Sequence, residues 1–332
     1  MNWGLVGAST IASEYVIGAI RGQGDGIATV LSGDPARGAA YAERHGIPAS
    51  AADLAGLLAT PGVDAVYIST TNEKHHAQAL AAIAAGKHVL CEKPLAMTAG
   101  EAAEMARAAQ AKGVVFATNH HLRNAGAHLA IRDLIASGRI GRVLSVRVFH
   151  AVHLPPHLQG WRIKDAGAGG GVIPDITVHD ADTVRFYLGE DPVEVVAMMG
   201  VSGMGEGVED SVMSVWSMPS GAMVQTHESF TRPFAGSGVE VHGSEGSIFG
   251  RGIMTQKPVG EVELVTAAGR EAVAFERHDL YGRGLRLFAE AAAGRGRPAA
   301  DGIDGVKSLA VALAVREAAR SGRATRVDYE GF

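Results

Sequence analysis

The chain has 332 residues, a formal net charge of −5, 47% hydrophobic residues and one cysteine, Cys91. Its length accommodates two domains, its acidic balance argues against a nucleic-acid partner, and a single cysteine excludes a disulfide framework. Strand-like residues begin at position 3 and no apolar run is long enough to cross a membrane, so we expect a cytoplasmic protein without a signal peptide.

The first 120 residues alternate between short apolar runs and helical patterns. Strands are predicted at residues 3–6, 27–31, 63–69, 87–91 and 114–118. Helices are predicted at residues 11–21, 36–44, 50–58 (capped by Ser50), 73–85 and 98–111. This alternation predicts an N-terminal Rossmann domain over residues 1–120, with a doubly wound parallel sheet.

The pattern changes in the remainder of the chain. Further strands are predicted at residues 143–152, 193–199, 212–218, 222–229, 238–242, 247–249 and 262–265. Helices are predicted at residues 126–137, 176–188, 281–293 and 306–319. Glycine and serine cluster in the turns between the strands. We therefore predict a C-terminal substrate-binding α+β domain over residues 121–332, with an open, mostly antiparallel sheet that is packed by helices on one face.

A degenerate dinucleotide-binding motif follows the first strand and opens the first helix. It consists of Gly7, Ala8, Ser9, Thr10, Ile11 and Ala12. In such motifs the first glycine makes a tight turn and the helix N-terminus meets the pyrophosphate. Ser9 replaces the middle glycine and crowds that approach. The position inside a βαβ unit still favours a dinucleotide site over an ordinary glycine turn.

The end of the second strand bears on the choice of dinucleotide. NAD-binding sites usually carry an acid there for the ribose 2′-hydroxyl, whereas this strand ends in Ser32 and Gly33. Arg37 follows on the first turn of the next helix, and arginine binds phosphate with bidentate geometry. We predict NADP(H) rather than NAD(H). The alternative is that Arg37 is a surface residue on an amphipathic helix.

Lys93 is a catalytic candidate because it comes directly after the strand at residues 87–91. In open α/β sheets, ligands bind at the carboxyl ends of the strands. Pro94 then restricts the backbone that follows Lys93. A lysine at this place can serve as an electrostatic clamp or a proton donor, and the alternative is a solvated loop lysine.

A second candidate group follows the glycine run at residues 169–171. Asp175, His179 and Asp182 are spaced to lie on one helical face. An acid and a histidine one turn apart suit general acid–base chemistry, although a helix cap and a core histidine would give the same pattern. No cluster of Cys, His or Glu has metal-ligand spacing, so we expect no metal.

The glycine turn at residues 7–12, the Glu92-Lys93-Pro94 step and the glycine run before Asp175 and His179 together resemble one oxidoreductase family. This is the glucose-fructose oxidoreductase/inositol dehydrogenase/rhizopine-catabolism (Gfo/Idh/MocA) family, and the resemblance covers essentially the whole chain. It implies that Lys93, Asp175 and His179 form the catalytic group. In the family the Lys-Pro step is often cis.

The resemblance also implies binding roles. Besides the residues named above, cofactor contacts are implied for Thr70, Thr71, Asn72, His75, Glu92, Lys93, Asn119, Trp161, Arg162 and Tyr281. The substrate pocket is implied to include His150, Trp161 and Arg162. Thr71 stands where the family has a proline.

Four segments, at residues 7–12, 118–124, 148–162 and 254–260, resemble more narrowly those members that reduce 1,5-anhydro-D-fructose to 1,5-anhydro-D-mannitol. The implied reaction is hydride transfer from NADPH to the C2 ketone of this ketose. Lys93 would polarise the carbonyl and His179 would donate the proton, or the two roles would be exchanged.

Other readings remain open on the sequence. The protein could be another NAD(P)-dependent sugar or cyclic polyol dehydrogenase of the same family, because fold and motif do not fix the substrate. It could also be a non-catalytic NADP(H)-binding regulator. We expect a monomer, with a dimer through the open sheet as the alternative.

Overall fold

The computed structural model describes residues 1–332 and divides the chain into two compact units. Unit 1 consists of Met1–His121 together with Tyr281–Val306, and unit 2 of Leu122–Leu280 together with Lys307–Phe332. The predicted boundary at residue 120 would place residues 281–306 in the C-terminal domain. They belong to unit 1 because they pack there. The Phe288 ring lies 5.2 Å from that of Trp3, and the Thr118 amide donates a 3.1 Å hydrogen bond to the Ala300 carbonyl.

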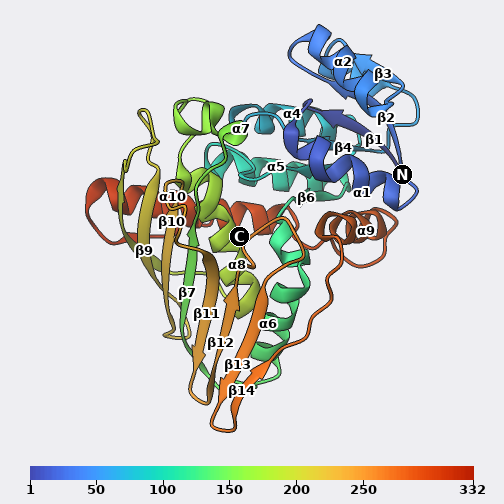
Figure 1. Cartoon of the computed structure of the whole chain (residues 1–332). Coiled ribbons are helices and arrows are strands. Elements are labelled where there is room, and N and C mark those ends of the chain that lie inside the picture. Colours follow the sequence, from blue (N-terminus) through green and yellow to red (C-terminus); the bar gives the residue numbers. More distant parts are fainter. The chain divides into compact units, whose positions relative to one another are not determined.

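Unit 1 is built on a six-stranded parallel sheet with strand order β3-β2-β1-β4-β5-β6 (Figure 1). The strands are β1 (Asn2–Val6), β2 (Gly26–Leu31), β3 (Ala49–Ala51), β4 (Ala65–Ile68), β5 (His88–Cys91) and β6 (Phe116–Thr118). The helices are η1 (Ala12–Val16), α1 (Ile17–Gly22), α2 (Pro35–His45), α3 (Leu54–Ala59), α4 (Asn72–Ala84), α5 (Ala99–Lys112) and α9 (Leu280–Ala292). The predicted doubly wound parallel sheet is therefore confirmed.

Local capping explains where several of these helices begin and end. The Asp34 side chain accepts hydrogen bonds from the first amides of α2, and Gly46 ends that helix in the left-handed conformation. The prediction that Ser50 caps the third helix is wrong. Ser50 lies in β3, and Asp53 instead accepts a 2.7 Å hydrogen bond from the Gly56 amide at the start of α3.

Unit 2 is built on a nine-stranded sheet with strand order β14-β13-β12-β11-β7-β10-β9-β8-β15. The strands are β7 (Val143–Ala151), β8 (Glu194–Gly200), β9 (Ser211–Ser217), β10 (Met223–Ser229), β11 (Ser237–Gly243), β12 (Gly246–Arg251), β13 (Glu261–Thr266), β14 (Gly269–Ala272) and β15 (Thr325–Arg326). All pairs are antiparallel except β7 with β10. The helical segments are η2 (His121–Asn124), α6 (Gly126–Ala136), α7 (Pro156–Gln159), η3 (Gly160–Ile163), η4 (Ile173–Thr177), α8 (Val178–Leu188) and α10 (Gly302–Ser321). The start of α10, up to Val306, belongs to unit 1.

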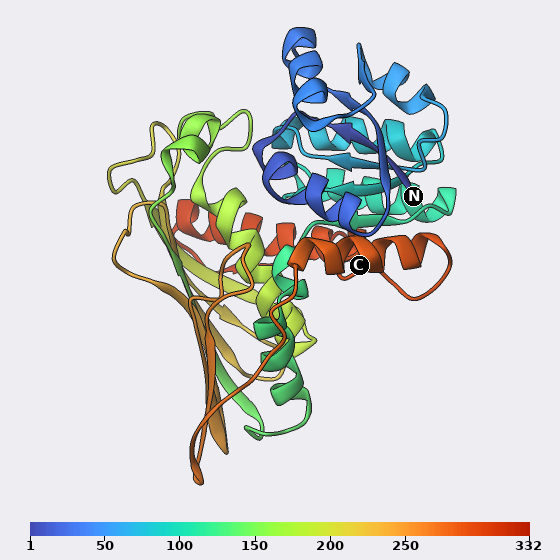
Figure 2. The ribbon, with the colours of Figure 1, turned by 45° about the vertical axis from the view of Figure 1, so that its right-hand side comes forward.

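The two faces of the nine-stranded sheet differ in character. Alternate residues such as Val146, Trp216 and Val224 are buried beneath α6 and α8, while Figure 2 shows the opposite face open. That open face carries exposed apolar side chains, including Met198 and Met223. The predicted open, mostly antiparallel sheet with helices on one face is confirmed.

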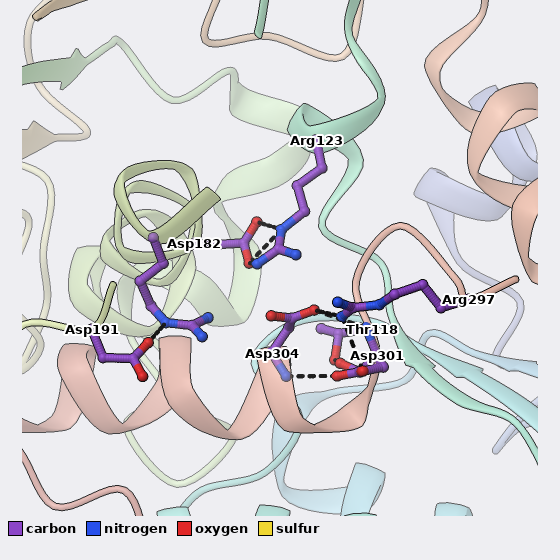
Figure 3. Close-up of polar contacts among 8 residues, drawn as sticks. Thr118, Arg123, Asp182, Asp191, Arg297, Asp301 and Asp304 are labelled. Carbon is purple, nitrogen blue, oxygen red and sulfur yellow. Dashed lines mark hydrogen bonds and ion pairs between the residues drawn. The ribbon is translucent and has the colours of Figure 1, made fainter. Parts of the chain in front are cut away.

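Each unit contains ion pairs that hold a helix, one of them buried and the other exposed (Figure 3). In unit 2, Arg123 forms a buried ion pair with Asp182 of α8. Its Nε lies 3.0 and 2.8 Å from the two carboxylate oxygens, and its Nη2 lies 2.7 Å from Oδ1. In unit 1, Arg297 contacts Asp301 at 3.0 Å and Asp304 at 2.7 Å, where α10 begins.

Candidate active site

The turn after β1 requires a glycine at position 7. Gly7 has a φ of +116°, and a Cβ there would lie 3.0 Å from both the carbonyl carbon and the oxygen of Ser69. Both are backbone atoms at the end of β4 and cannot swing aside. The turn therefore approaches the next strand as closely as a dinucleotide-binding turn must.

Ser9 takes over a bonding role in this turn. Its hydroxyl lies 2.7 Å from that of Ser69 and accepts a 3.2 Å hydrogen bond from the Ala12 amide. The Tyr41 hydroxyl donates a 2.9 Å hydrogen bond to the Ser9 carbonyl. The serine that replaces the middle glycine thus ties the start of η1 to β4 and to α2.

Ser32 and Arg37 lie at the same edge of the sheet. Ser32 follows β2 and is buried, and its hydroxyl accepts a 3.3 Å hydrogen bond from the Asp34 amide. The Arg37 guanidinium reaches back from α2 and donates a 2.6 Å hydrogen bond to the Ala8 carbonyl. The structure therefore brings Arg37 to the glycine turn. Gly33, between them, has open space around its α-carbon.

The segment after β4 is held to the segment after β5 by His75. This buried ring lies 2.8 Å from the Pro94 carbonyl and 3.2 Å from the Thr70 carbonyl. Burial lowers the pKa of His75, so the ring is neutral and donates to the nearer carbonyl. The Lys93–Pro94 peptide bond is cis, as the family resemblance implies. Asn72, at the start of α4, is also buried.

Glu92 and Asn119 form a second polar group, at the ends of β5 and β6. Glu92 Oε1 accepts hydrogen bonds from the Tyr67 hydroxyl at 2.5 Å and from Asn119 Nδ2 at 2.6 Å. Burial, reinforced by the charge of Glu92, raises the pKa of Tyr67 well above its ordinary value. Nearby, the Tyr281 ring stacks on those of Tyr15 and His121, with centroids 5.0 and 5.6 Å apart.

In unit 2 the structure brings Asp175 together with Trp161 and Arg162. Arg162 Nε lies 3.4 Å from Asp175 Oδ1, and the guanidinium stacks over the Trp161 ring at 4.7 Å. The glycine run makes this approach possible, because a Cβ on Gly170 would lie 2.7 Å from the Trp161 carbonyl.

Thr70, Thr71 and the other predicted cofactor residues after β1, β2, β4, β5 and β6 lie in unit 1.

His179 and His150 are neighbours within unit 2. Their ring centroids lie 6.3 Å apart, and both side chains are nearly buried. His150 Nδ1 is 2.8 Å from Asp180 Oδ1. Asp182, which the spacing placed on the face of Asp175 and His179, is engaged in the ion pair with Arg123.

Sequence reasoning missed two buried acids beside this histidine pair, Asp180 and Glu228, both with no exposed surface. A signal was present, because alternation along β10 places Thr226 and Glu228 on the same side as buried Val224. A strand that turns polar side chains toward a core is a candidate for a functional network.

Two further properties concern metals and membranes. The structure contains no group of three or more His, Cys, Asp or Glu residues that could hold a metal ion. None of its helices combines the length and the apolar character that a membrane span needs.

Strand order 3-2-1-4-5-6 with a glycine turn beside the central strands defines a dinucleotide-binding Rossmann unit, here joined to a mixed-sheet unit. The chain belongs to the Gfo/Idh/MocA family of oxidoreductases. Residues 1–120 match the family's NAD-binding Rossmann fold, and residues 128–249 match its C-terminal domain. The family expected from the sequence is confirmed.

Similarity to individual proteins extends over the whole chain. The chain is 57% identical to the 1,5-anhydro-D-fructose reductase of Ensifer adhaerens, over 98% of both chains. It is 30% identical to D-xylose 1-dehydrogenase (NADP(+)) 2 of Haloferax volcanii, over 99% of this chain and 100% of that one. The aldose-aldose oxidoreductase of Caulobacter crescentus, solved with glycerol, has a TM-score of 0.89 at 25% identity, covering 98% and 99% of the two chains.

Proposed function

We propose that this protein reduces the C2 ketone of 1,5-anhydro-D-fructose with NADPH and forms 1,5-anhydro-D-mannitol. The observation that carries the proposal is the 57% identity, over 98% of both chains, to a relative named for that substrate. The polar groups of unit 2 around Asp175, His179 and His150 suit a small hydroxylated ligand, since they offer both donors and acceptors.

The residues of unit 1 fit a dinucleotide. Gly7 leaves no side chain between the turn and β4, and the first amides of η1 lie where a pyrophosphate is bound in this fold. When bound, the cofactor supplies the hydride. Within the protein, we assign stabilisation of the negative charge on the ketone oxygen to Lys93 and delivery of the proton to His179. Asp175, held by Arg162, orients a sugar hydroxyl.

The test of the catalytic assignment is Lys93→Met. We expect kcat to fall by about two to four orders of magnitude, the range for a general acid or an oxyanion-stabilising group. NADPH binding, measured separately by fluorescence titration, should persist. Lys74→Met, at an exposed lysine of α4, is the matched control and should keep full turnover. A Lys93→Met enzyme with unaltered kcat would show that the assignment is wrong.

Preference for NADPH is the second part of the proposal, and Arg37 and Ser32 support it. The 2′-phosphate of NADPH would gain charge-assisted hydrogen bonds from Arg37, each worth about 1.5–3 kcal/mol, or roughly 10- to 150-fold in affinity. Arg37→Ala should weaken the binding of NADPH by about this factor and the binding of NADH much less. Arg44→Ala, exposed in the last turn of the same helix, controls for general effects of losing a charge. Equal losses for both cofactors would contradict the preference.

A second candidate function is oxidation of a sugar or cyclic polyol with NADP⁺. The full-length similarity to D-xylose 1-dehydrogenase (NADP(+)) 2 favours it. A panel of ketoses with NADPH, and of aldoses and polyols with NADP⁺, followed by nicotinamide absorbance, separates the two. Tight NADPH binding without turnover of any sugar would instead indicate a non-catalytic regulator.

We also propose that the protein is a cytoplasmic monomer. Besides the exposed apolar side chains of β8 to β10, the sheet carries exposed ion pairs, Arg147 of β7 with Glu240 of β11 and Arg251 of β12 with Glu263 of β13. A partner covering this face would have to desolvate those charges. Sedimentation velocity across a range of protein concentrations tests the proposal, and a concentration-independent dimer would contradict it.

A further inference from the structure

A chain of buried polar side chains runs beneath His150 in unit 2. Its members come from two strands and a helix and are all within the core. They are Trp216 and Ser214 of β9, Thr226 and Glu228 of β10, and Asp180 of α8. Strand register brings them together, because Thr226 pairs directly with Ser214 and Glu228 pairs with His150.

The direction of the hydrogen bonds follows from Trp216, since an indole N–H can only donate. It donates to the Ser214 hydroxyl oxygen at 2.7 Å. Thr226 has a single hydroxyl proton, which it donates to Glu228 Oε2 at 3.1 Å. Ser214 therefore donates to Thr226 across the 2.7 Å between their hydroxyls. Each donor in this run is used once and points toward Glu228.

The other end of the chain is His150. A carboxylate oxygen can only accept, so the contact of 2.8 Å between His150 Nδ1 and Asp180 Oδ1 places a proton on Nδ1. Two buried oxygens are then left, Asp180 Oδ2 and Glu228 Oε1. Neither receives a hydrogen bond from an N–H or hydroxyl group.

The two carboxyl groups act on each other. Burial raises the pKa of both well above the ordinary range, and the charge of Asp180 raises the pKa of Glu228 further. The Thr177 hydroxyl is close enough to stabilise the charged form of Glu228, although it makes no regular hydrogen bond. Two neighbouring carboxylates without water would repel each other and lack donors, and one proton between them removes both problems.

We propose that Asp180 and Glu228 share one buried proton, carried by Glu228 and donated to Asp180, and that this acid pair fixes the tautomer of His150. His150 then has its proton on Nδ1 and presents Nε2 as the nitrogen for the substrate. Asp180 and Glu228 are positioning residues, since they act through His150. The proposal rests on the proposed function only in assigning His150 to the substrate pocket.

Other titratable groups surround the pair and bear on any pH dependence. They are His179, Asp182 and Tyr187 of α8, His128 of α6 and Arg123 of η2. His227 of β10 lies on the opposite face of the sheet, against Phe149. Asp182 and Arg123 balance each other as an ion pair. Burial lowers the pKa of His128 and raises the pKa of Tyr187, so both are neutral near pH 7. The histidine that the acid pair contacts is His150, through Asp180.

The shared proton can be observed without substrate. Infrared spectra of the intact protein in H2O and D2O near neutral pH should contain the carbonyl stretch of a protonated carboxylic acid. Glu228→Gln should remove that band. Thr177→Val should retain it, and Glu209→Gln controls for a second half-buried acid. A spectrum that Glu228→Gln leaves unaltered would overturn the shared proton, whether or not the proposed sugar is the substrate.

The effect on His150 requires the proposed reaction. Glu228→Leu should lower kcat/KM by about 10- to 100-fold, as for other groups that orient a functional histidine. Glu228→Gln should restore most of this loss, because its amide N–H mimics the protonated acid.

Asp180→Asn should move the pH profile of kcat/KM to lower pH, because a negative charge beside His150 is removed. An unaltered profile in a folded Asp180→Asn protein, or a Glu228→Gln enzyme as impaired as Glu228→Leu, would overturn the role assigned to the pair. If Asp180→Asn does not fold, the infrared spectra still test the shared proton, and the comparison of kcat/KM between Glu228→Gln and Glu228→Leu still tests the role of the pair.

Discussion

Replacing Gly7 by alanine tests the close approach between the β1 turn and β4. The added Cβ would stand 3.0 Å from the Ser69 carbonyl carbon and oxygen and 3.1 Å from the Thr70 amide nitrogen. The φ of +116° is also strained for any residue with a side chain. Backbone strain costs about 1–3 kcal/mol, and overpacking against fixed atoms adds about 1–3 kcal/mol. We therefore expect Gly7→Ala to lower the free energy of unfolding by about 2–6 kcal/mol.

Urea unfolding, followed by circular dichroism, measures this loss, and a titration with NADPH measures binding. Relief of the clash would separate the turn from Ser69, so NADPH affinity should fall roughly tenfold or more, which corresponds to about 1.4 kcal/mol. Gly33→Ala is the matched control for stability, because its Cβ would meet nothing within 4 Å and its φ is not in the left-handed region. It should stay within about 1 kcal/mol of the unaltered protein. Equal stability of the two variants would refute the reasoning.

Two further predictions concern unit 2. Asp182→Asn should cost about 3–5 kcal/mol, because it leaves the buried Arg123 charge without its carboxylate; a loss below about 1 kcal/mol in urea unfolding would contradict this. Burial lowers the pKa of His128 to about 4, and the neutral ring donates from Nε2 to the Ile253 carbonyl while Nδ1 accepts from the Tyr187 hydroxyl. Because the unfolded histidine titrates near pH 6.5, the contribution of neutral His128 to the free energy of unfolding is fully present above about pH 6.5. As the pH falls toward 4, the free energy of unfolding decreases by up to about 3 kcal/mol. Unfolding at several pH values should show this slope, and His128→Asn should flatten it; an equal slope in both proteins would count against the assignment.

The strand and helix pattern of unit 1 could be predicted from sequence because each element carries its own signal. Buried strands such as β4 are apolar throughout, and helices end at glycines such as Gly46 and Gly113. The strand β3 has no such signal, because Ala49–Ala51 is a short edge strand of small residues. The return of residues 281–306 to unit 1 depends on packing partners such as Trp3, which local pattern does not specify.

Within the candidate site, two backbone features could be recognised from the sequence. The glycine turn and the glycine run are visible in the sequence because only glycine fits where two backbones approach closely, as at Gly7 and Gly170. The Asp180–Glu228 pair was not found, since it depends on which strand lies beside β7 and in what register. Sequence alternation shows that Glu228 faces inward but not that His150 lies opposite.

Unit 1 is built from two segments that lie far apart in the sequence, and this has a consequence for folding during synthesis. A ribosome delivers the chain from its N-terminus, and domains usually fold in that order. Here the six strands of the first sheet are complete by Thr118, yet Phe288 has still to pack against Trp3, and Gly302 against Phe116. The core residues of the N-terminal sheet therefore stay uncovered until most of unit 2 has been synthesised. Its completion coincides with that of unit 2, which itself needs Lys307–Phe332. Chaperones that shield apolar surface would meet the first sheet during that interval.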